Sequence, residues 1–147
     1  MVSRFFAIFA NVKEQNERTM TRKNYGYKKP FDYFSEIIYE KETKTGKNGS
    51  MGTTISVMFF DDSCRVLKVN WGADIDYEYS RDGEVEIAMG FNKENTQKLM
   101  LRTGTHNAAD MVAALAQRFK KHGASAFEKI QEFCDEKEIQ YSYNVHY

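Results

Sequence analysis

The chain contains little cysteine and little proline, and it lacks any long apolar run. Its 147 residues include two cysteines, Cys64 and Cys134, and one proline. Two cysteines are too few for a disulfide scaffold, and they show no Cys-x-x-Cys spacing for zinc. The apolar runs are far too short to cross a membrane. These absences predict a cytoplasmic protein with no disulfide framework, no metal or cofactor, and no membrane association.

The first residues of the sequence are not expected to form a secretory signal. An apolar patch follows Arg4, but polar Asn11 and charged Lys13 interrupt it before it reaches the length of a signal segment. Residues 2–12 are instead interpreted as a β-strand that is apolar on both faces. Such a strand is expected in the interior of a sheet.

No excess of charge of one sign exists over the whole chain. There are 21 cations and 21 acids, so no global field attracts nucleic acid or an acidic membrane. The local distribution is uneven: residues 1–50 carry ten Lys or Arg against six acids, whereas residues 61–86 carry eight acids against three cations. We therefore expect a basic arm and an acidic sheet face.

The composition is that of a globular protein rich in aromatic residues. Apolar residues make up 41% and charged residues 29%, and the chain has 11 Phe and 9 Tyr. This bias favours aromatic packing in a compact sheet. The length suits one domain, so residues 1–147 are expected to form a single α+β domain.

Four runs of alternating residues lie between Thr53 and Gly90, separated by short polar loops. Their apolar positions stay in phase, which predicts a four-stranded antiparallel meander with one buried face. That face would carry Ile55, Val57, Phe59, Leu67, Val69, Trp71, Ile75, Tyr77, Tyr79, Val85, Ile87 and Met89. Three-residue loops at 61–63, 72–74 and 81–83 would set the register. They would pair Val57 with Leu67, Val69 with Tyr77, Tyr79 with Val85, and Tyr77 with Ile87.

The segments before the meander are less regular. Residues 13–30 are polar and hold no apolar period, so they are expected to form a long basic loop or arm. Residues 31–42 allow two interpretations. Pro30 suits the first turn of a helix, whereas Ile37-Ile38-Tyr39 suits a strand; we favour the helix. Glycines at 46, 49 and 52 indicate a flexible connection.

After Phe91 the apolar period changes from two to 3.6, which predicts helices. The first, at about 93–102, would be capped by Asn92 and closed by Gly104. The second would start at Asn107, with Asp110 in its first turn, and would bury a stripe from Ala108 to Phe119. The third would start at a capping box, Ser125-x-x-Glu128. Residues 139–147 then alternate as a last strand, which could join the sheet beside the strand expected at 2–12 or pair by its edge with a second copy. Helices need an apolar surface to cover, so the expected architecture is a two-layer sandwich with the helices on one face of the antiparallel sheet.

The first candidate site is the acidic face of the predicted sheet, formed by Asp76, Glu78, Glu84 and Glu86. The predicted register sets Glu78 opposite Glu86, and like charges at such positions are normally destabilising. A bound partner protein would relieve this repulsion, and a divalent cation held by carboxylates is an alternative. A solvated polar face that binds nothing is the third interpretation.

The second candidate is the arm, where cations alternate with tyrosines: Arg18, Arg22, Lys23, Tyr25, Tyr27, Lys28 and Lys29. Cations neutralise phosphates and tyrosines stack on unpaired bases, so the arm has a rationale for binding single-stranded nucleic acid. A solvated loop whose tyrosines pack on the core is the alternative.

No catalytic motif is present. Neither cysteine has an evident partner, and His106, His122 and His146 are scattered without metal-ligand spacing. A third candidate site is a pocket between helices and sheet around Trp71, Tyr77, Arg102 and His106, which would make the protein a small ligand-binding or catalytic domain.

The favoured hypothesis is a small intracellular binding protein that engages another protein through its acidic face or its last strand. Inhibitors of host defence from phages and mobile elements often share this lack of motifs, so that class is a specific version of the hypothesis. The last strand could also form a homodimer by pairing of edges.

Overall fold

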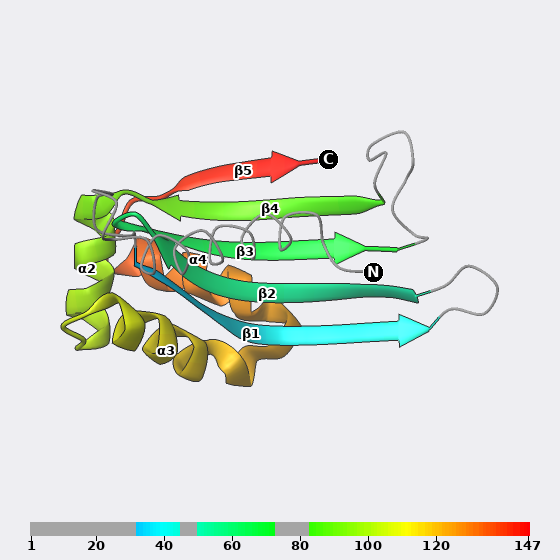
Figure 1. Cartoon of the computed structure of the whole chain (residues 1–147), viewed down its shortest axis with the longest axis horizontal. Helices are drawn as coiled ribbons and strands as arrows, with labels where there is room; N and C mark the ends of the chain where they lie inside the picture. The colour runs from blue at the N-terminus through cyan, green and yellow to red at the C-terminus, as the bar shows by residue number, and fades with distance from the viewer. Residues whose placement is uncertain (1–31, 45–49, 73–82) are drawn as a thin grey trace, which may run out of the picture.

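A computed structural model describes residues 32–44, 50–72 and 83–147. In it, five strands form one antiparallel sheet whose spatial order, β1-β2-β3-β4-β5, is the order along the chain (Figure 1). The strands are β1 (Tyr33–Lys44), β2 (Ser50–Phe60), β3 (Ser63–Trp71), β4 (Glu84–Phe91) and β5 (Ser142–His146). Strands β1 and β5 are therefore the two edges of the sheet among the described strands.

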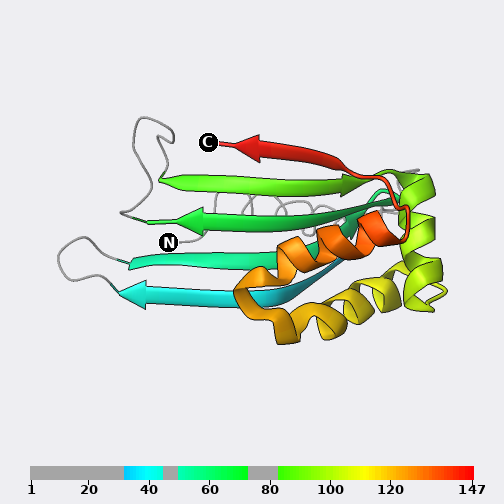
Figure 2. The same cartoon turned by 180° about the vertical axis from the view of Figure 1, so that it is seen from behind.

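All described helices lie between β4 and β5 in the chain: α2 (Lys93–Thr103), α3 (Ala108–Phe119), the 3-10 helix η3 (Lys120–Ser125) and α4 (Ala126–Glu136). Figure 2 shows α3 and α4 on one face of the sheet, and α2 at one end of it. The main core lies between these two layers, with Val57, Val66 and Met89 from the sheet against Leu115 and Ile130 from the helices. The expected α+β two-layer sandwich, with an antiparallel sheet covered on one face, is confirmed.

The helix ends follow the sequence signals in two of three cases. The Asn92 side chain accepts a hydrogen bond from the backbone N–H of Asn95 and so begins α2, while Gly104 ends it in the left-handed conformation. Asn107 caps α3 in the same way. The capping box expected at Ser125 does not form, because Ser125 is the last residue of η3 and makes no side-chain capping hydrogen bond.

The expectation of a helix at residues 31–42 is wrong. Tyr33–Lys44 forms strand β1, which pairs with β2 along its length. The β-branched and aromatic run Ile37-Ile38-Tyr39 favours a strand, and its pairing with β2 outweighs the helix-start signal of Pro30. A register shift between Ile37 and Tyr39 interrupts the ladder there, and Ile38 is 3% exposed.

The turn between β2 and β3 has two residues instead of the expected three. Phe60 pairs with Ser63, so only Asp61 and Asp62 form the loop, with φ of 50° and 64°. Two successive positive φ values characterise the tight hairpin turn that matches strand twist. The predicted pairing of Val57 with Leu67 is consequently wrong by one residue, because Val57 pairs with Val66.

A one-residue shift reverses the faces of a strand. Val66 therefore faces the helices, and the side chains of Leu67, Val69 and Trp71 lie on the opposite face of the sheet, here called the second face. Leu67 forms a small buried cluster with Met58 and Ala88 there. The central strands thus bury side chains on both faces. This accounts for consecutive apolar residues such as Val66-Leu67.

The predicted third strand does not lie between β3 and β4. Val69 pairs with Thr54 on one side and Glu86 on the other, and Ile87 lies between Lys68 and Val145. Val69 and Ile87 are therefore paired on both sides, so neither can pair with Tyr77 as the sequence predicted. The Gly72 N–H donates a hydrogen bond to the Gly83 carbonyl (3.1 Å), which closes the two ends of the connection. Residues 73–82 themselves are outside the described part of the chain.

Two further expectations concern segments that the structure does not describe. The strand at residues 2–12 and the basic arm at 13–30 both lie outside the described residues. The C-terminal strand is confirmed as β5.

Candidate functional site

The cysteines are poor candidates for chemistry. Cys64 and Cys134 are both free and buried. Burial raises the pKa of each thiol to about 12, with a smaller contribution from Cys134 at Cys64 and from Asp135 at Cys134. A thiol is nucleophilic only as thiolate, so both side chains serve the core. Among the described residues, no group of three or more His, Cys, Asp or Glu side chains is placed to hold a metal ion.

The residues of the third candidate pocket are not brought together. Trp71 ends β3 and lies on the second face, away from the helical layer. Arg102 is in the last turn of α2 and His106 lies between α2 and α3, at the opposite end of the sheet (Figure 1). Tyr77 is outside the described residues. The one-residue change of register explains why Trp71 lies on the second face, although it was expected on the helix side.

The acidic candidates are only partly described. Asp76 and Glu78 lie outside the described residues. Glu84 was expected to be exposed, but it is 5% exposed, and Glu86 is half-buried. Because Glu86 pairs with Val69 and His146, the predicted pairing of Glu78 with Glu86 is wrong. The cross-strand pair of like charges that suggested a bound cation is therefore not formed by Glu86 in the described ladders, and a protein-binding role for this face stays a prediction.

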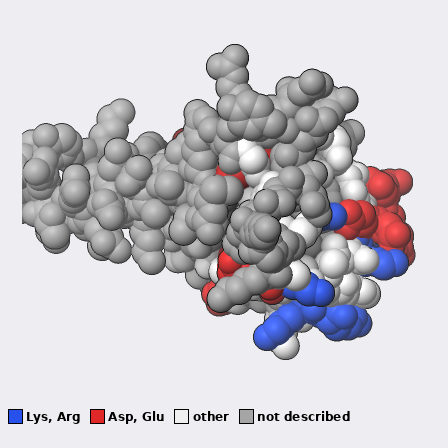
Figure 3. Space-filling view, turned by 90° about the vertical axis from the view of Figure 1, so that its right-hand side faces the viewer, with Lys and Arg blue, Asp and Glu red and all other residues white. Residues whose placement is uncertain are grey.

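The basic arm, with Arg18, Arg22, Lys23, Tyr25, Tyr27, Lys28 and Lys29, lies outside the described residues. Its binding of nucleic acid stays a prediction. Figure 3 shows blue and red side chains close together at one end of the molecule, so charges of both signs are interspersed in the described part of that surface.

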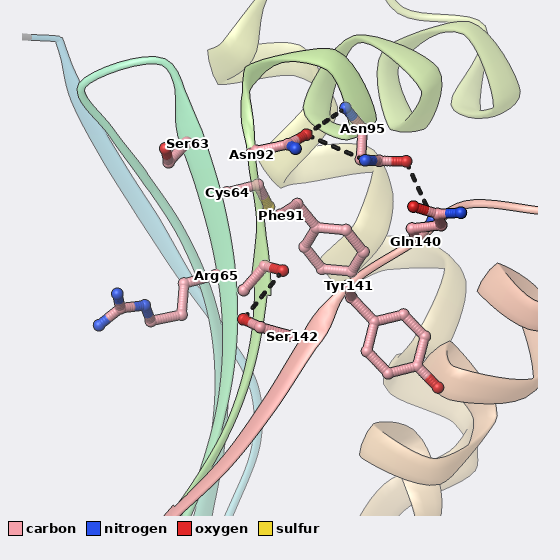
Figure 4. A pocket seen from close by; sticks show the side chains of 10 residues that line it. Ser63, Cys64, Arg65, Phe91, Asn92, Asn95, Gln140, Tyr141 and Ser142 are labelled. Atoms are coloured by element: carbon pink, nitrogen blue, oxygen red, sulfur yellow. Dashed lines mark hydrogen bonds between the residues drawn. The ribbon is translucent and has the colours of Figure 1, made fainter.

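A groove lies at the end of the sheet where β5 begins, and we call it the end groove. It has a volume of about 460 Å³. Its lining comes from β3, β4, the start of α2 and the start of β5: Ser63, Cys64, Arg65, Gly90, Phe91, Asn92, Asn95, Gln140, Tyr141 and Ser142. Figure 4 shows the rings of Phe91 and Tyr141 close together, and the Arg65 side chain pointing away from them.

Hydrogen bonds connect the polar groups of the end groove to one another. Asn95 donates its backbone and side-chain N–H groups to Asn92 Oδ1, both at 2.9 Å, and Asn95 Oδ1 accepts from the Gln140 N–H at 2.9 Å (Figure 4). The Ser142 hydroxyl donates to the Gly90 carbonyl at 3.4 Å. This chain of bonds fixes the segment that leads into β5 against the start of α2. The residues of the end groove therefore position a strand.

Gly90 permits this close approach of β5. A Cβ atom at Gly90 would lie 2.7 Å from Ser142 Oγ, closer than side-chain atoms normally pack. On the other side of the segment, the Tyr141 hydroxyl donates to Asp135 Oδ1 at 3.0 Å. Burial and this carboxylate raise the pKa of Tyr141, so the phenol stays protonated and keeps donating.

Strand β5 is exposed along most of its length, and we call its outer side the β5 edge. Ser142, Tyr143, Asn144 and His146 are exposed and Val145 is half-buried. Among the described strands only β4 pairs with it. The sequence Ser-Tyr-Asn-Val-His contains no Lys, Arg, Asp, Glu or Pro. An edge strand presents unpaired backbone N–H and C=O groups, and β5 has none of the usual side chains that keep another strand away.

The opposite edge is protected by several of these devices. Strand β1 carries charged residues at Glu36, Glu40, Lys41, Glu42 and Lys44. Its ladder with β2 is also interrupted by the register shift between Ile37 and Tyr39. Helix α3 lies alongside β1 in both views (Figures 1 and 2). Charges, bulges and covering elements all discourage pairing of edges. The two edges of the sheet therefore differ in their capacity to accept another strand.

The sequence predicted β5 as a strand and its edge as a docking surface, but it did not predict the end groove. Asn92 was identified only as a helix cap, and Asn95 and Gly90 were not singled out. Their contacts with Gln140 and Ser142 span 45 and 52 residues along the chain. No local pattern signals such distant partners.

Within the described ranges, no helix combines the length and the apolarity that a transmembrane span requires. A scan against protein families and searches of curated proteins and of solved structures found no match to this chain.

Proposed function

We propose that this protein binds another polypeptide by strand addition, in which an extended segment of the partner pairs with the β5 edge. The observation that carries the proposal is the contrast between the two edges of one sheet. Strand β5 is exposed and uncharged, whereas β1 is charged, bulged and flanked by α3. Natural sheets normally protect both edges, so an edge that no described strand or helix covers is a candidate docking surface.

The backbone of the β5 edge would supply the affinity. Alternate residues of an edge strand direct their N–H and C=O groups away from the sheet, and a partner strand satisfies them with main-chain hydrogen bonds. Uncharged side chains leave this approach open. The hydrogen bonds of Gln140 and Ser142 hold the start of β5 in place before a partner arrives, which lowers the entropic cost of binding.

The side chains of β5 would supply the specificity. Tyr143 and Val145 lie on the helix side of the sheet, in register with Met89 and Ile87. Tyr143 is 53% exposed, and exposed tyrosines are enriched in protein interfaces because they offer a large rigid contact area. Ser142 and Asn144 offer polar groups on the second face. A partner strand with alternating apolar and polar residues would match both sides.

The hypothesis that the partner belongs to a host defence system is a narrower version of this proposal, and it remains a prediction. Strand addition depends on backbone hydrogen bonds, so crosslinking at the β5 edge would capture the partner whatever its identity.

The test is site-specific photo-crosslinking in the cells that make the protein. A benzoylphenylalanine residue replaces Asn144 at the β5 edge, and in a matched variant it replaces Thr43, an exposed residue of β1. We expect a discrete crosslinked polypeptide at position 144 and none at position 43. Mass spectrometry then identifies the adduct and the attached residue.

Two results would count against the proposal. The first is the absence of any adduct from position 144 in a variant whose circular dichroism spectrum matches that of the unmodified protein. The second is an identical set of adducts from both edges, which would indicate nonspecific contact.

A further inference from the structure

We infer that the polypeptide bound at the β5 edge is the β5 strand of a second copy of this chain, in an antiparallel pair centred on Asn144. This inference rests on the proposed function, because it names the occupant of the same edge. It predicts a symmetric dimer in which the five strands of each copy join into one continuous sheet.

The sequence of β5 is complementary to itself in this arrangement. An antiparallel pair centred on Asn144 sets Asn144 opposite its own copy, Tyr143 opposite Val145, and Ser142 opposite His146. Aromatic side chains pair favourably with β-branched ones across strands, and this contact occurs twice in the dimer. Two asparagine side chains at the centre can hydrogen-bond to each other, since each amide carries both donors and acceptors.

The two faces of the sheet also match in such a dimer. Residues directly opposite each other in an antiparallel pair point to the same face. The Tyr143 and Val145 pairs therefore lie on the helix side, where Tyr143 already contacts Phe127 of α4. The polar pairs of Ser142, Asn144 and His146 lie on the second face. Neither face places an apolar side chain opposite a charged one.

Charge does not oppose the association. Strand β5 contains no Lys, Arg, Asp or Glu, so the pairing brings no like charges together, and the net charge of each copy is zero. Addition of β5 to the β1 edge of another copy is less favourable, because β1 carries charges and a register shift. That head-to-tail contact would also lead to open chains of molecules, whereas the two-fold pair closes.

The test uses the central position of the pair, where one substitution meets its own copy. In Asn144→Lys two lysines face each other, and in Asn144→Asp two carboxylates do. We expect each variant alone to raise the dimer dissociation constant by at least about fivefold in sedimentation velocity. An equimolar mixture of the two variants should restore dimers, because each lysine then meets a carboxylate. Thr43→Lys on β1 is the matched control and should dimerise like the unmodified protein.

The outcomes separate this inference from the proposed function. A protein that stays monomeric over the whole concentration range overturns the inference, and a different protein crosslinked at position 144 would then still support strand addition. A dimer that Asn144→Lys does not weaken overturns the inference as well. If each variant alone dimerises more weakly but the equimolar mixture does not restore the dimer, Asn144 does not lie opposite its own copy, and the proposed pairing is wrong.

Discussion

The ring of Phe127 in α4 meets the ring of Tyr143 in β5 edge to face, with centroids 6.4 Å apart and planes inclined by 65°. Phe127 is buried in the main core, and Tyr143 stands at the border of the β5 edge. This contact links a strand of five residues to the helical layer. It also holds one aromatic side chain of the β5 edge in a defined orientation.

The first prediction concerns the energy of this contact. Replacing Phe127 by Ala should lower the free energy of unfolding by about 3–5 kcal/mol, because it leaves a cavity in the core. Tyr143→Ala should lower the free energy of unfolding much less, since the Tyr143 side chain is half exposed. A double-mutant cycle by urea unfolding should give a coupling of about 0.5–1.5 kcal/mol between the two rings. A coupling near zero would mean that Tyr143 is not held by Phe127.

The second prediction concerns the ion pair between Lys68 of β3 and Glu128 of α4, whose charged atoms are 2.9 Å apart. Partial burial alone would raise the pKa of Glu128. The hydrogen bond from Lys68, a backbone hydrogen bond and the charge of Lys68 together have a larger and opposite effect, so the pKa of Glu128 is lowered. Glu128 is half exposed, so solvent screening limits the contribution of this ion pair to the free energy of unfolding to about 1 kcal/mol or less.

A lowered pKa in the folded state stabilises the protein above the unfolded pKa of Glu, about 4.3, and this contribution is lost as the pH falls through the folded pKa. The difference in unfolding free energy between the unmodified protein and Lys68→Met should therefore be larger at pH 7 than at pH 3. Lys129→Met, which breaks an exposed pair with Glu132, serves as the control. If Lys68→Met lowers the free energy of unfolding equally at pH 7 and pH 3, Lys68 does not lower the pKa of Glu128 in the folded protein.

The third prediction concerns the tight turn between β2 and β3. Asp62 has a φ of 64°, a conformation that glycine adopts without steric cost. Asp62→Gly should raise the free energy of unfolding by about 0.5 kcal/mol or more. Glycine removes the steric cost of the positive φ, and this gain exceeds the entropy that glycine adds to the unfolded chain. Asp62→Ala should lower it, because alanine lacks the local hydrogen bonds by which Asp tolerates this conformation. Equal effects of both changes would argue against the two-residue turn.

The fourth prediction concerns the reactivity of the cysteines. Because burial raises the pKa of Cys64 and Cys134 to about 12, very little thiolate exists at pH 8. Alkylation by iodoacetamide should be at least about a hundredfold slower in the folded protein than in guanidinium chloride. Rapid labelling of either residue in the folded protein would show that it is accessible and contradict its place in the core.

The helical half of the fold could be predicted from the sequence, and the register of the sheet could not. Asn92, Gly104 and the stripe from Ala108 to Phe119 are local signals, and the structure follows them. The register of β2 with β3 depends on whether the loop between them has two residues, Asp61 and Asp62, or three. Aspartates suit both loop lengths, so the faces of β3 were assigned incorrectly.

The same limit explains the wrong face predicted for Trp71, which pairs on the second face with Glu84, a residue that was expected to be exposed and is buried. The alternation of apolar residues in β3 fits either face, because Val66 and Leu67 are both buried. Only the pairing with β2 decides which of them meets the helices. The strand predicted at 75–79 depended on alternation alone, whereas the direct pairing of β3 with β4 is a long-range contact that no local pattern reports.

The candidate site was predicted in part. The alternation in residues 139–147 predicted β5 as a strand, and pairing of its edge with another molecule was one of two predicted arrangements. The protection of the opposite edge was not predicted, because residues 31–42 were expected to form a helix. The contrast between β1 and β5 emerges only when both are seen as the edges of one sheet.

Hydrogen exchange of the β5 backbone tests the central claim most directly. The exchange of residues 142–146 is measured by mass spectrometry in dilute protein and in the complex that crosslinking at position 144 identifies, with β1 as the internal reference. Strand addition predicts strong protection of β5 in the complex and unchanged exchange in β1, because new main-chain hydrogen bonds form only at the β5 edge. A complex that forms without protecting β5 would contradict the account.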